Sequence, residues 1–484
     1  MNNIRFKSHK RPSPHRLTRK GALSMKLTEL AAAAGLDCSA EAEITALACR
    51  STEVTPGALF AALKGARADG RDYMPEAVAR GAAAVLCAGA VGAPVPVLTS
   101  PEPREALARM AAAFYGRPGD AMTLIAVTGT KGKTTTACML RDILLAGGRT
   151  VGMIGTLGAF LGREQLAPAA NTTPEPIALH ALLRRMADAG ATHVVMEASS
   201  QAMKLHRLAG LTFEIALFLN LSPDHIGPGE HADLAEYRAC KAALFRQCRL
   251  ALGNTADPAW PLMAAQAPAA RAIEPLPIRR GAGLTTEVGP FTVPMPGTFN
   301  GENARAAIAA ARALGVGEGA IAAGLAACRV PGRCELCPVP APFSVVIDYA
   351  HNGAAMRSLL SALRPCGRII AVFGAGGDRP PMRRHDLARA AAGGADFAVL
   401  TADNPRSEDP AAICAQIAAA MPDLPHVIVP DRAAAIRRAL DMARPGDVVA
   451  LLGKGHEGYM EVSGRRIPFS ERAVVEDYFR GREA

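Results

Sequence analysis

The chain has 484 residues, half of them hydrophobic and a fifth charged, which exceeds one ordinary hydrophobic core and predicts about three domains. Its formal net charge of +10 suits anionic small substrates, and the lack of aromatic-studded basic stretches argues against a nucleic-acid partner. Residues 81–101 carry no charge, but prolines and glycines interrupt them, so we predict no membrane partner and no membrane span. Eleven scattered cysteines are typical of a reducing, cytoplasmic compartment.

The N-terminal end is basic. Residues 1–24 contain seven basic and no acidic residues and lack an apolar core, which excludes a secretory signal. We predict a disordered tail or a start-site artefact over 1–24, with a nucleic-acid arm as the less favoured alternative. Residues 25–117 then alternate helix-like and strand-like pieces up to the Gly/Pro-rich linker 116–120. They predict an N-terminal α/β domain.

Two further domains are predicted, a central one over 118–330 and a C-terminal one over 331–484. Apolar strands in the central segment indicate a mostly parallel sheet, and the C-terminal segment repeats strand–helix units of a Rossmann-like, doubly wound kind. The fold class is therefore α/β in three domains, with ligands expected at the carboxyl ends of strands. The predicted strands are 124–127, 193–196, 215–219, 345–347, 368–373, 398–400, 426–429 and 448–452.

A phosphate-binding loop is the most specific motif. The strand 124–127 runs into a glycine-containing turn that opens an apolar-periodic helix at 137–145. Loop amides would surround phosphates, Lys133 would add a charge, and the Thr134 hydroxyl could ligate Mg²⁺. Val127 stands where the strict pattern has its first glycine, but the flanking strand and helix disfavour a merely solvated turn. The predicted nucleotide-binding residues are Gly129, Thr130, Lys131, Gly132, Lys133, Thr134 and Thr135.

Polar clusters follow several predicted strands. Glu197, directly after the strand 193–196, is placed to hold Mg²⁺ near the loop. The cluster 171–175 taken alone favours capping of a helix over substrate binding. Three polar turns in the C-terminal domain each follow an apolar strand, which predicts a binding cleft there. These turns are 348–352, 403–406 and 453–457.

Two of these turns indicate an amino-acid-like ligand. Arg406 offers a planar fork that suits a carboxylate, and Asn404 supplies both a donor and an acceptor. Glu457 would meet an ammonium group. Together they predict a site for a zwitterion.

With these residues assembled, the chain from Met25 onward resembles the Mur ligases, ATP-dependent amide-forming enzymes of peptidoglycan precursor synthesis. The resemblance is closest to the members that add the third residue of the stem peptide. It implies that ATP converts the carboxylate of UDP-MurNAc-L-Ala-D-Glu into an acyl phosphate, which the amine of meso-diaminopimelate attacks. The motifs are the loop 129–135, NTTPE at 171–175, MEASS at 196–200, NLSPDH at 220–225, YRACKAALF at 237–245, PGTFNGEN at 296–303, GRCE at 332–335, DYAHN at 348–352, GGDR at 376–379, DNPRSEDP at 403–410 and GKGHE at 453–457.

The resemblance also implies a role for individual residues. Lys133, Glu197, Lys241 and His351 match catalytic positions, and Thr134, Glu197 and a carbamoylated Lys241 match the ligands of two Mg²⁺ ions. The family's positions around the nucleotide correspond to Asn303, Arg333 and Asp348 in this chain. Those that bind the UDP-sugar dipeptide in the N-terminal and central domains match Ser51, Asn171, Thr172, Thr173, Ser199 and Arg207. The family's positions that bind the incoming amino acid correspond to Arg379, Asp403, Asn404, Pro405, Arg406, Gly453 and Glu457.

Some motifs depart from this pattern and leave alternatives open. The Asp-Asn-Pro-Arg form marks diaminopimelate, whereas DHIGPGEH at 224–231 looks more like the lysine-adding branch. Arg50-Ser51-Thr52 also replaces the usual Asp-Ser-Arg of the N-terminal domain. The main alternative is thus a paralogue that adds L-lysine or another amino acid, and the second is a non-catalytic nucleotide-binding scaffold. We expect ATP and Mg²⁺ as cofactors, small-molecule partners and a monomer.

Overall fold

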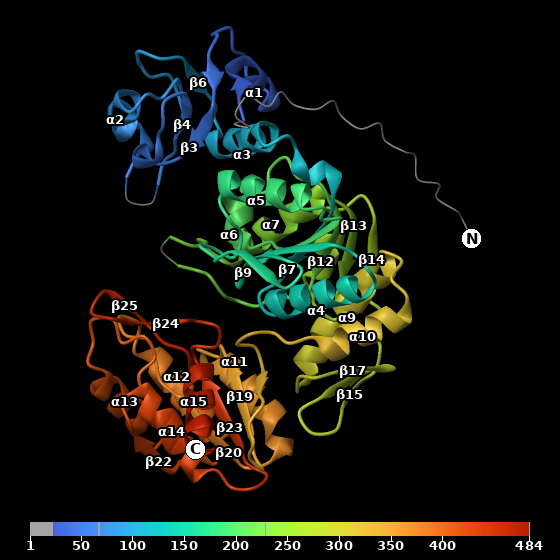
Figure 1. Cartoon of the computed structure of the whole chain (residues 1–484), viewed down its shortest axis with the longest axis vertical. Helices are drawn as coiled ribbons and strands as arrows, with labels where there is room; N and C mark the ends of the chain where they lie inside the picture. Colours follow the sequence, from blue (N-terminus) through green and yellow to red (C-terminus); the bar gives the residue numbers. More distant parts are fainter. Residues whose placement is uncertain (1–22, 66–67, 228, 484) are drawn as a thin grey trace.

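The computed structural model describes residues 23–65, 68–227 and 229–483, so the tail predicted over 1–24 lies, except for its last two residues, outside the described part. The molecule is elongated, with the N-terminal domain at one end, the central domain in the middle and the C-terminal domain at the other end (Figure 1). Among the described residues, no helix is long and apolar enough to cross a membrane.

The N-terminal domain is a parallel four-stranded sheet between helices. Leu59 and Ala61 of one strand pack with α1 and α3, while Phe60 and Ala62 face α2, as the two-residue repeat of a strand requires. Helix α3 also contacts α5 (Pro176–Asp188) of the central domain, which joins the two domains. The sheet order is β3 (Ala46–Ala48), β4 (Ala58–Ala62), β5 (Ala84–Cys87) and β6 (Val97–Thr99), with β1 (Met25–Lys26) paired to β2 (Glu43–Ile44) and helices α1 (Leu27–Ala33), α2 (Met74–Ala79) and α3 (Pro103–Phe114).

The central domain is built on an eight-stranded sheet. Its strands run parallel except for an antiparallel edge made by β9 and β10. The order is β10 (Glu164–Ala167), β9 (Gly158–Leu161), β8 (Val151–Gly155), β11 (His193–Glu197), β7 (Thr123–Thr128), β12 (Phe213–Phe218), β13 (Cys248–Gly253) and β14 (Ala270–Ala272). A separate small sheet contains β15 (Ile278–Arg280), β16 (Thr286–Val288) and β17 (Phe291–Val293).

Helices cover both faces of this sheet (Figure 1). Ile125 and Val127 of β7 pack with α4, α9 and α10, while Leu124 and Ala126 pack with α5 and α7. This two-sided burial explains why β7 is a continuous apolar run. The helices are α4 (Lys133–Ala146), α5 (Pro176–Asp188), α6 (Ser200–Lys204), α7 (Leu234–Ala243), α8 (Trp260–Ala264), α9 (Thr298–Ala313) and α10 (Glu318–Ala327). Trp260, the one tryptophan of the chain, stacks on Phe218 of β12 with ring centroids 6.3 Å apart.

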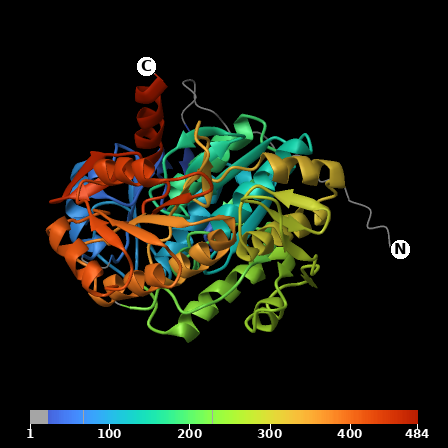
Figure 2. The same ribbon diagram turned by 90° about the horizontal axis from the view of Figure 1, so that it is seen from below.

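The C-terminal domain is a doubly wound sheet. Its order is β18 (Glu335–Cys337), β19 (Ser344–Asp348), β23 (Val448–Leu452), β20 (Ile369–Phe373), β21 (Phe397–Leu400) and β22 (His426–Ile428), and only β18 is antiparallel. Helices α11 (Gly353–Leu363), α12 (Met382–Ala392) and α13 (Pro410–Ala419) pack on one face, and α14 (Arg432–Met442) and α15 (Glu471–Glu483) on the other. Helix α15 stands out at the edge of the molecule (Figure 2), and β24 (Tyr459–Val462) and β25 (Arg465–Pro468) form a hairpin. The predicted α/β fold class is thereby confirmed.

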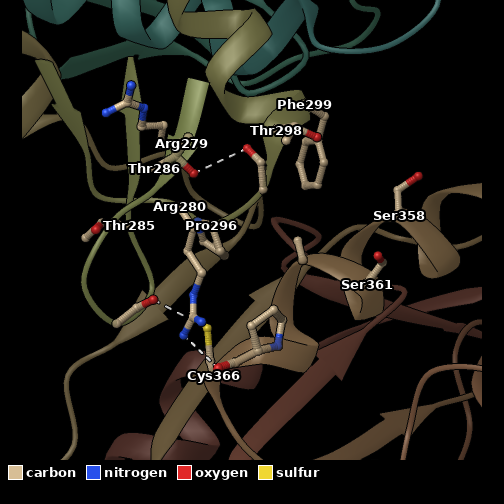
Figure 3. A pocket seen from close by; sticks show the side chains of 14 residues that line it. Arg279, Arg280, Thr285, Thr286, Pro296, Thr298, Phe299, Ser358, Ser361 and Cys366 are labelled. Atoms are coloured by element: carbon tan, nitrogen blue, oxygen red, sulfur yellow. Dashed lines mark hydrogen bonds between the residues drawn. The ribbon is translucent and has the colours of Figure 1, made fainter. Parts of the chain in front are cut away.

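A small cavity of about 210 Å³ lies where the small sheet of the central domain meets the C-terminal domain (Figure 3). The Arg280 guanidinium donates to the Pro365 carbonyl at 2.6 Å, and the Cys366 thiol donates to the Gly283 carbonyl at 3.4 Å. These bonds connect the two domains. None of the residues predicted to bind substrate or nucleotide lines this cavity.

A buried ion pair joins two strand ends of the C-terminal sheet. The guanidinium of Arg432 bonds the Glu471 carboxylate at 2.6 and 3.1 Å, and both side chains are fully buried. Arg432 also donates at 2.8 Å to the carbonyls of Ala402 and Leu452, which follow or end β21 and β23. It therefore fixes the points from which the turns 403–406 and 453–457 leave the sheet.

Replacing Arg432 by methionine should lower the free energy of unfolding of the C-terminal domain by about 3–5 kcal/mol, because the Glu471 carboxylate is left buried without its partner. Hydrogen exchange of C-terminal peptides in the absence of ligands measures this change. The double variant Arg432→Met/Glu471→Leu should regain part of the loss, since it buries no unpaired charge. Equal losses in the single and double variants would contradict this account.

Candidate functional site

The phosphate-binding loop joins β7 to α4 directly. The helix begins at Lys133, four residues earlier than the apolar periodicity predicts, because Gly132 turns the chain with a φ of +86° and the threonines that follow continue the helix. A side chain at Gly132 would lie 2.1 Å from the Asn303 amide oxygen. Lys133 donates its ammonium to the carbonyls of Gly129 at 2.8 Å and Thr130 at 3.2 Å. Burial lowers the pKa of Lys133, although Glu197 acts in the opposite direction.

Glu197 is the centre of a buried oxygen cluster beside this loop. It ends β11, next to β7 in the sheet, and accepts the Thr134 hydroxyl at 2.9 Å. It also accepts the Thr156 amide at 2.8 Å and the Thr156 hydroxyl at 3.2 Å. Gly155 must be glycine here, since a Cβ would lie 2.2 Å from a Glu197 oxygen. A carboxylate and hydroxyls beside a phosphate loop are the hard oxygen donors that Mg²⁺ prefers, so these residues fit the ion.

Lys241 reaches the same loop from α7. The residue is 1% exposed, and its ammonium donates to the Gly129 carbonyl at 3.0 Å and lies 4.7 Å from the centre of the Tyr237 ring. Burial, and next the nearby charge of Lys133, lower its pKa well below the ordinary value of a lysine. The neutral amine that this favours is nucleophilic, which a solvated lysine at neutral pH is not.

The residues predicted to bind the sugar dipeptide are only partly brought together. Thr173 donates its hydroxyl to the Glu197 carbonyl at 2.8 Å and accepts the Ser199 amide at 3.1 Å, while Arg207 donates to the Thr173 carbonyl at 2.9 Å. Thr172 lies within 3.0 Å of the Thr156 hydroxyl. The capping alternative for 171–175 is not what the helix uses, because α5 is capped at Glu175 with no side-chain bond. Asn171 is exposed, and Ser51 begins a short turn in the N-terminal domain away from the cleft.

A cleft of about 870 Å³ joins the central and C-terminal domains. It brings the phosphate loop and the ends of β19, β20, β21 and β23 to one space. The predicted residues that line it are Thr130, Lys131, Gly132, Lys133, Thr134, Thr135, Thr172, Glu197, Arg333, His351, Arg379, Asp403, Asn404, Arg406, Gly453 and Glu457. A mainly apolar pocket of about 240 Å³ shares Lys131 and Gly132 with the cleft and contains Asn303.

Asp348 and His351 are fixed by the turn after β19. Asp348 accepts the amides of Cys334 and Ala350, each at 2.7 Å, and burial raises its pKa. The ring Nδ1 of His351 lies 2.9 Å from the Tyr349 carbonyl, which can only accept, so Nδ1 carries the proton. Burial lowers the pKa of His351, and its Nε2 is therefore an acceptor at neutral pH. Arg333 stacks on the Tyr349 ring at 4.6 Å.

The residues predicted to bind a zwitterion lie together on the C-terminal-domain side of the cleft. Asn404 donates its amide to Glu457 at 2.9 Å, and the Tyr349 hydroxyl donates to Glu457 at 3.3 Å. Arg406 donates to the Gly377 carbonyl at 2.5 Å and pairs with Glu461 of the hairpin at 3.3 Å. Gly453 needs a φ of +110°, and its Cβ would lie 2.8 Å from Asp403.

Four contributors were missed by sequence reasoning: Thr156, Tyr349, Lys454 and Glu461. Thr156 and Glu461 contact the site through partners 41 and 55 residues away, and nothing in their local sequence indicates this. Tyr349 and Lys454 lie within motifs that were recognised, so their place in DYAHN and GKGHE was a usable signal.

Known proteins agree with this arrangement. Mur ligase domain models match residues 43–115 (Mur ligase family, catalytic domain), 127–273 (Mur ligase middle domain) and 332–455 (Mur ligase, glutamate ligase domain). The chain belongs to the Mur ligase family. The predicted family and enzyme class, an ATP-dependent ligase, are thereby confirmed.

Relatives over nearly the full length carry one name. Proteins of Solibacter usitatus and Gloeobacter violaceus, both named UDP-N-acetylmuramoyl-L-alanyl-D-glutamate–2,6-diaminopimelate ligase, are 39% and 40% identical to this chain. The matches cover 91% and 93% of this chain and 94% and 97% of the relatives. A solved structure with the same name is similar with a TM-score of 0.68 at 28% identity, over 95% of this chain and all of its own.

Replacing Glu197 by glutamine should lower ATP turnover at least about a hundredfold, as expected when a group that stabilises transition-state charge is removed. The amide keeps the shape but loses the charge that a cation needs. Steady-state phosphate release at saturating substrates measures the effect. Glu214→Gln, which changes a carboxylate of β12 paired with Arg249, is the matched control and should turn over normally. Equal rates for the two variants would count against a role for Glu197.

Proposed function

We propose that this enzyme joins UDP-MurNAc-L-Ala-D-Glu to meso-diaminopimelate at the expense of ATP, in peptidoglycan precursor synthesis. The observation that carries the proposal is one cleft lined by the phosphate loop of the central domain and by Arg406, Asn404 and Glu457 of the C-terminal domain. The name shared by relatives at about 40% identity supports the same substrates. We place the reaction in the cytoplasm, which is consistent with eleven cysteines that are all free. We also propose that the enzyme is a monomer.

The reaction has two steps. An oxygen of the D-Glu side-chain carboxylate attacks the γ-phosphorus of ATP, the bond to ADP breaks, and an acyl phosphate forms. The amine of the incoming amino acid then attacks the acyl carbon, the bond to phosphate breaks, and the amine loses a proton. The loop amides and Lys133 meet the negative charge that develops on the phosphoryl oxygens. The unprotonated Nε2 of His351 lines the same cleft and can accept a hydrogen bond there.

Thr134 and Glu197 would hold Mg²⁺, which when bound neutralises phosphate charge. Lys241 as a carbamate would supply a second anionic ligand, and its neutral amine is the form that can react with CO₂. The apolar pocket with Leu219, Ile273 and Phe299 suits the adenine ring, with Asn303 at its edge. The N-terminal domain, with Ser51, is assigned to the uridine nucleotide, and the dipeptide to Asn171, Thr172, Thr173, Ser199 and Arg207.

Besides the DHIGPGEH stretch, the L-lysine alternative has one structural observation in its favour. The guanidinium of Arg406 already faces the Glu461 carboxylate, and an acidic group at this point would also suit a second ammonium. A non-catalytic scaffold is disfavoured because Lys133, Thr134 and Glu197 retain a connected arrangement that binding alone does not require.

Phosphate release from ATP should depend on UDP-MurNAc-L-Ala-D-Glu and meso-diaminopimelate together, because the acyl phosphate needs an amine acceptor to turn over. The same assay with L-lysine runs in parallel. Turnover with L-lysine alone would replace the proposed amino acid, and no stimulation by either would favour a different acceptor or a scaffold.

Changing Arg406 to alanine should raise KM for meso-diaminopimelate by roughly ten- to a hundredfold, the value of a charge-assisted pair to a carboxylate. The KM values for ATP and the UDP substrate should stay within about twofold. Arg389→Ala, on the exposed side of α12, is the control. An unchanged KM for the amino acid in Arg406→Ala would reject its assignment to the second carboxylate.

A further inference from the structure

Lys454 is a buried cation in the turn after β23. Its side chain has no exposed surface, although it belongs to a glycine-rich turn where a lysine would ordinarily point to solvent. The ammonium donates to the Asn404 amide oxygen at 3.0 Å and to a Glu457 oxygen at 3.0 Å. Asp403 lies 3.7 Å away. Because it is enclosed, Lys454 does not itself face the cleft, and it is absent from the residues that line it.

The contacts of Lys454 fix the orientation of the Asn404 side chain. The amide oxygen accepts from the Lys454 ammonium and from the backbone N–H of Glu461 at 2.8 Å. With both donors on the oxygen side, the amide nitrogen must point to Glu457, to which it donates at 2.9 Å. An amide rotated by half a turn would place its NH₂ group against two donors. Lys454 therefore selects one of the two possible arrangements.

The Lys454 ammonium also keeps the nearby Glu457 carboxylate ionised. Asp403 and Glu457 bring two carboxylates to a buried place, and Lys454 is the cation between them. Burial alone would raise the pKa of Glu457, but Lys454 and the hydrogen bonds from Asn404, Lys454 and Tyr349 outweigh it and lower the pKa. Glu457 thus stays ionised, and among the described residues its Oε1 accepts only the long bond from Tyr349 at 3.3 Å. That oxygen is the one able to receive a ligand ammonium.

We propose that Lys454 is the positioning residue of the amino-acid subsite, which holds Asn404 and the Glu457 carboxylate ready for the ammonium group of the incoming amino acid. The inference rests on the proposed function, since it assumes that Asn404 and Glu457 bind that amino acid. Lys454 acts through these two residues and contacts no substrate. Its loss should therefore weaken the amino-acid step and leave the nucleotide and UDP-substrate steps alone.

The test measures KM for each of the three substrates in Lys454→Met. We expect KM for the amino acid to rise roughly ten- to a hundredfold, as when a buried polar group loses its partner, with KM for ATP and the UDP substrate unchanged within about twofold. Lys454→Gln, which keeps a donor but no charge, gives a second variant should the methionine variant fail to fold. Arg368→Met is the matched control, because Arg368 pairs with Asp447 at the opposite end of the same sheet.

The pH profile distinguishes a positioning role of Lys454 from a general loss of stability of the C-terminal domain. In the native enzyme Lys454 lowers the pKa of Glu457, so its removal raises that pKa. The ionised carboxylate is the competent form, and the acid limb of kcat/KM for the amino acid should therefore move to higher pH in both Lys454 variants. A merely destabilised domain, as in Arg368→Met, should leave the limb in place.

Glu457→Gln distinguishes failure of this inference from failure of the proposed function. If Glu457→Gln leaves KM for the amino acid unchanged, the subsite itself is misassigned. If Glu457→Gln raises it while both Lys454 variants behave like Arg368→Met, the positioning role is overturned and the subsite stands. A raised amino-acid KM with the shifted acid limb in the Lys454 variants supports the proposal.

Discussion

Two ammonium groups, one buried and one half-buried, meet at one carbonyl oxygen in this enzyme. Lys133 and Lys241 come from different helices and both donate to Gly129, at 2.8 and 3.0 Å. Positive charges so near each other and so little solvated are stable together only if an anion joins them or one is neutral. The positive charge of these two ammonium groups is therefore not balanced at the loop, and the phosphates of a bound nucleotide would balance it.

In the C-terminal domain, by contrast, the buried positive charges are balanced. There the buried cations Lys454 and Arg432 are matched by carboxylates of the same domain, Glu457, Asp403 and Glu471. At the loop, no carboxylate of the described residues bonds the Lys133 or Lys241 ammonium, whereas the buried cations of the C-terminal domain are paired with carboxylates. An anionic ligand would balance the first group of charges, whereas the second group needs no counter-ion.

Much of this architecture could be predicted because burial on both faces leaves a direct trace in the sequence. The strand 448–452 was predicted with its observed bounds, and the other predicted strands of the parallel sheets lie within two residues of theirs. The start of α4 was missed, since hydrophobic periodicity does not register the three threonines that open it. Most of the residues that line the cleft and lie inside recognised motifs were predicted from the sequence. Thr156 and Glu461 were not, because a hydrogen bond across the fold between distant residues has no local pattern, and Lys454 was overlooked because a lysine among glycines indicates solvent.

The stacking of Trp260 on Phe218 has a practical consequence. The indole is the chain's one tryptophan, and its ring occupies the space beside Gly253 at the end of β13, one residue before Asn254 of the apolar pocket. Intrinsic fluorescence excited at the indole is therefore a spectroscopic label of the central domain. Events confined to the C-terminal domain, which has no tryptophan, should leave it unchanged, so the central domain can be followed by itself in the unlabelled molecule.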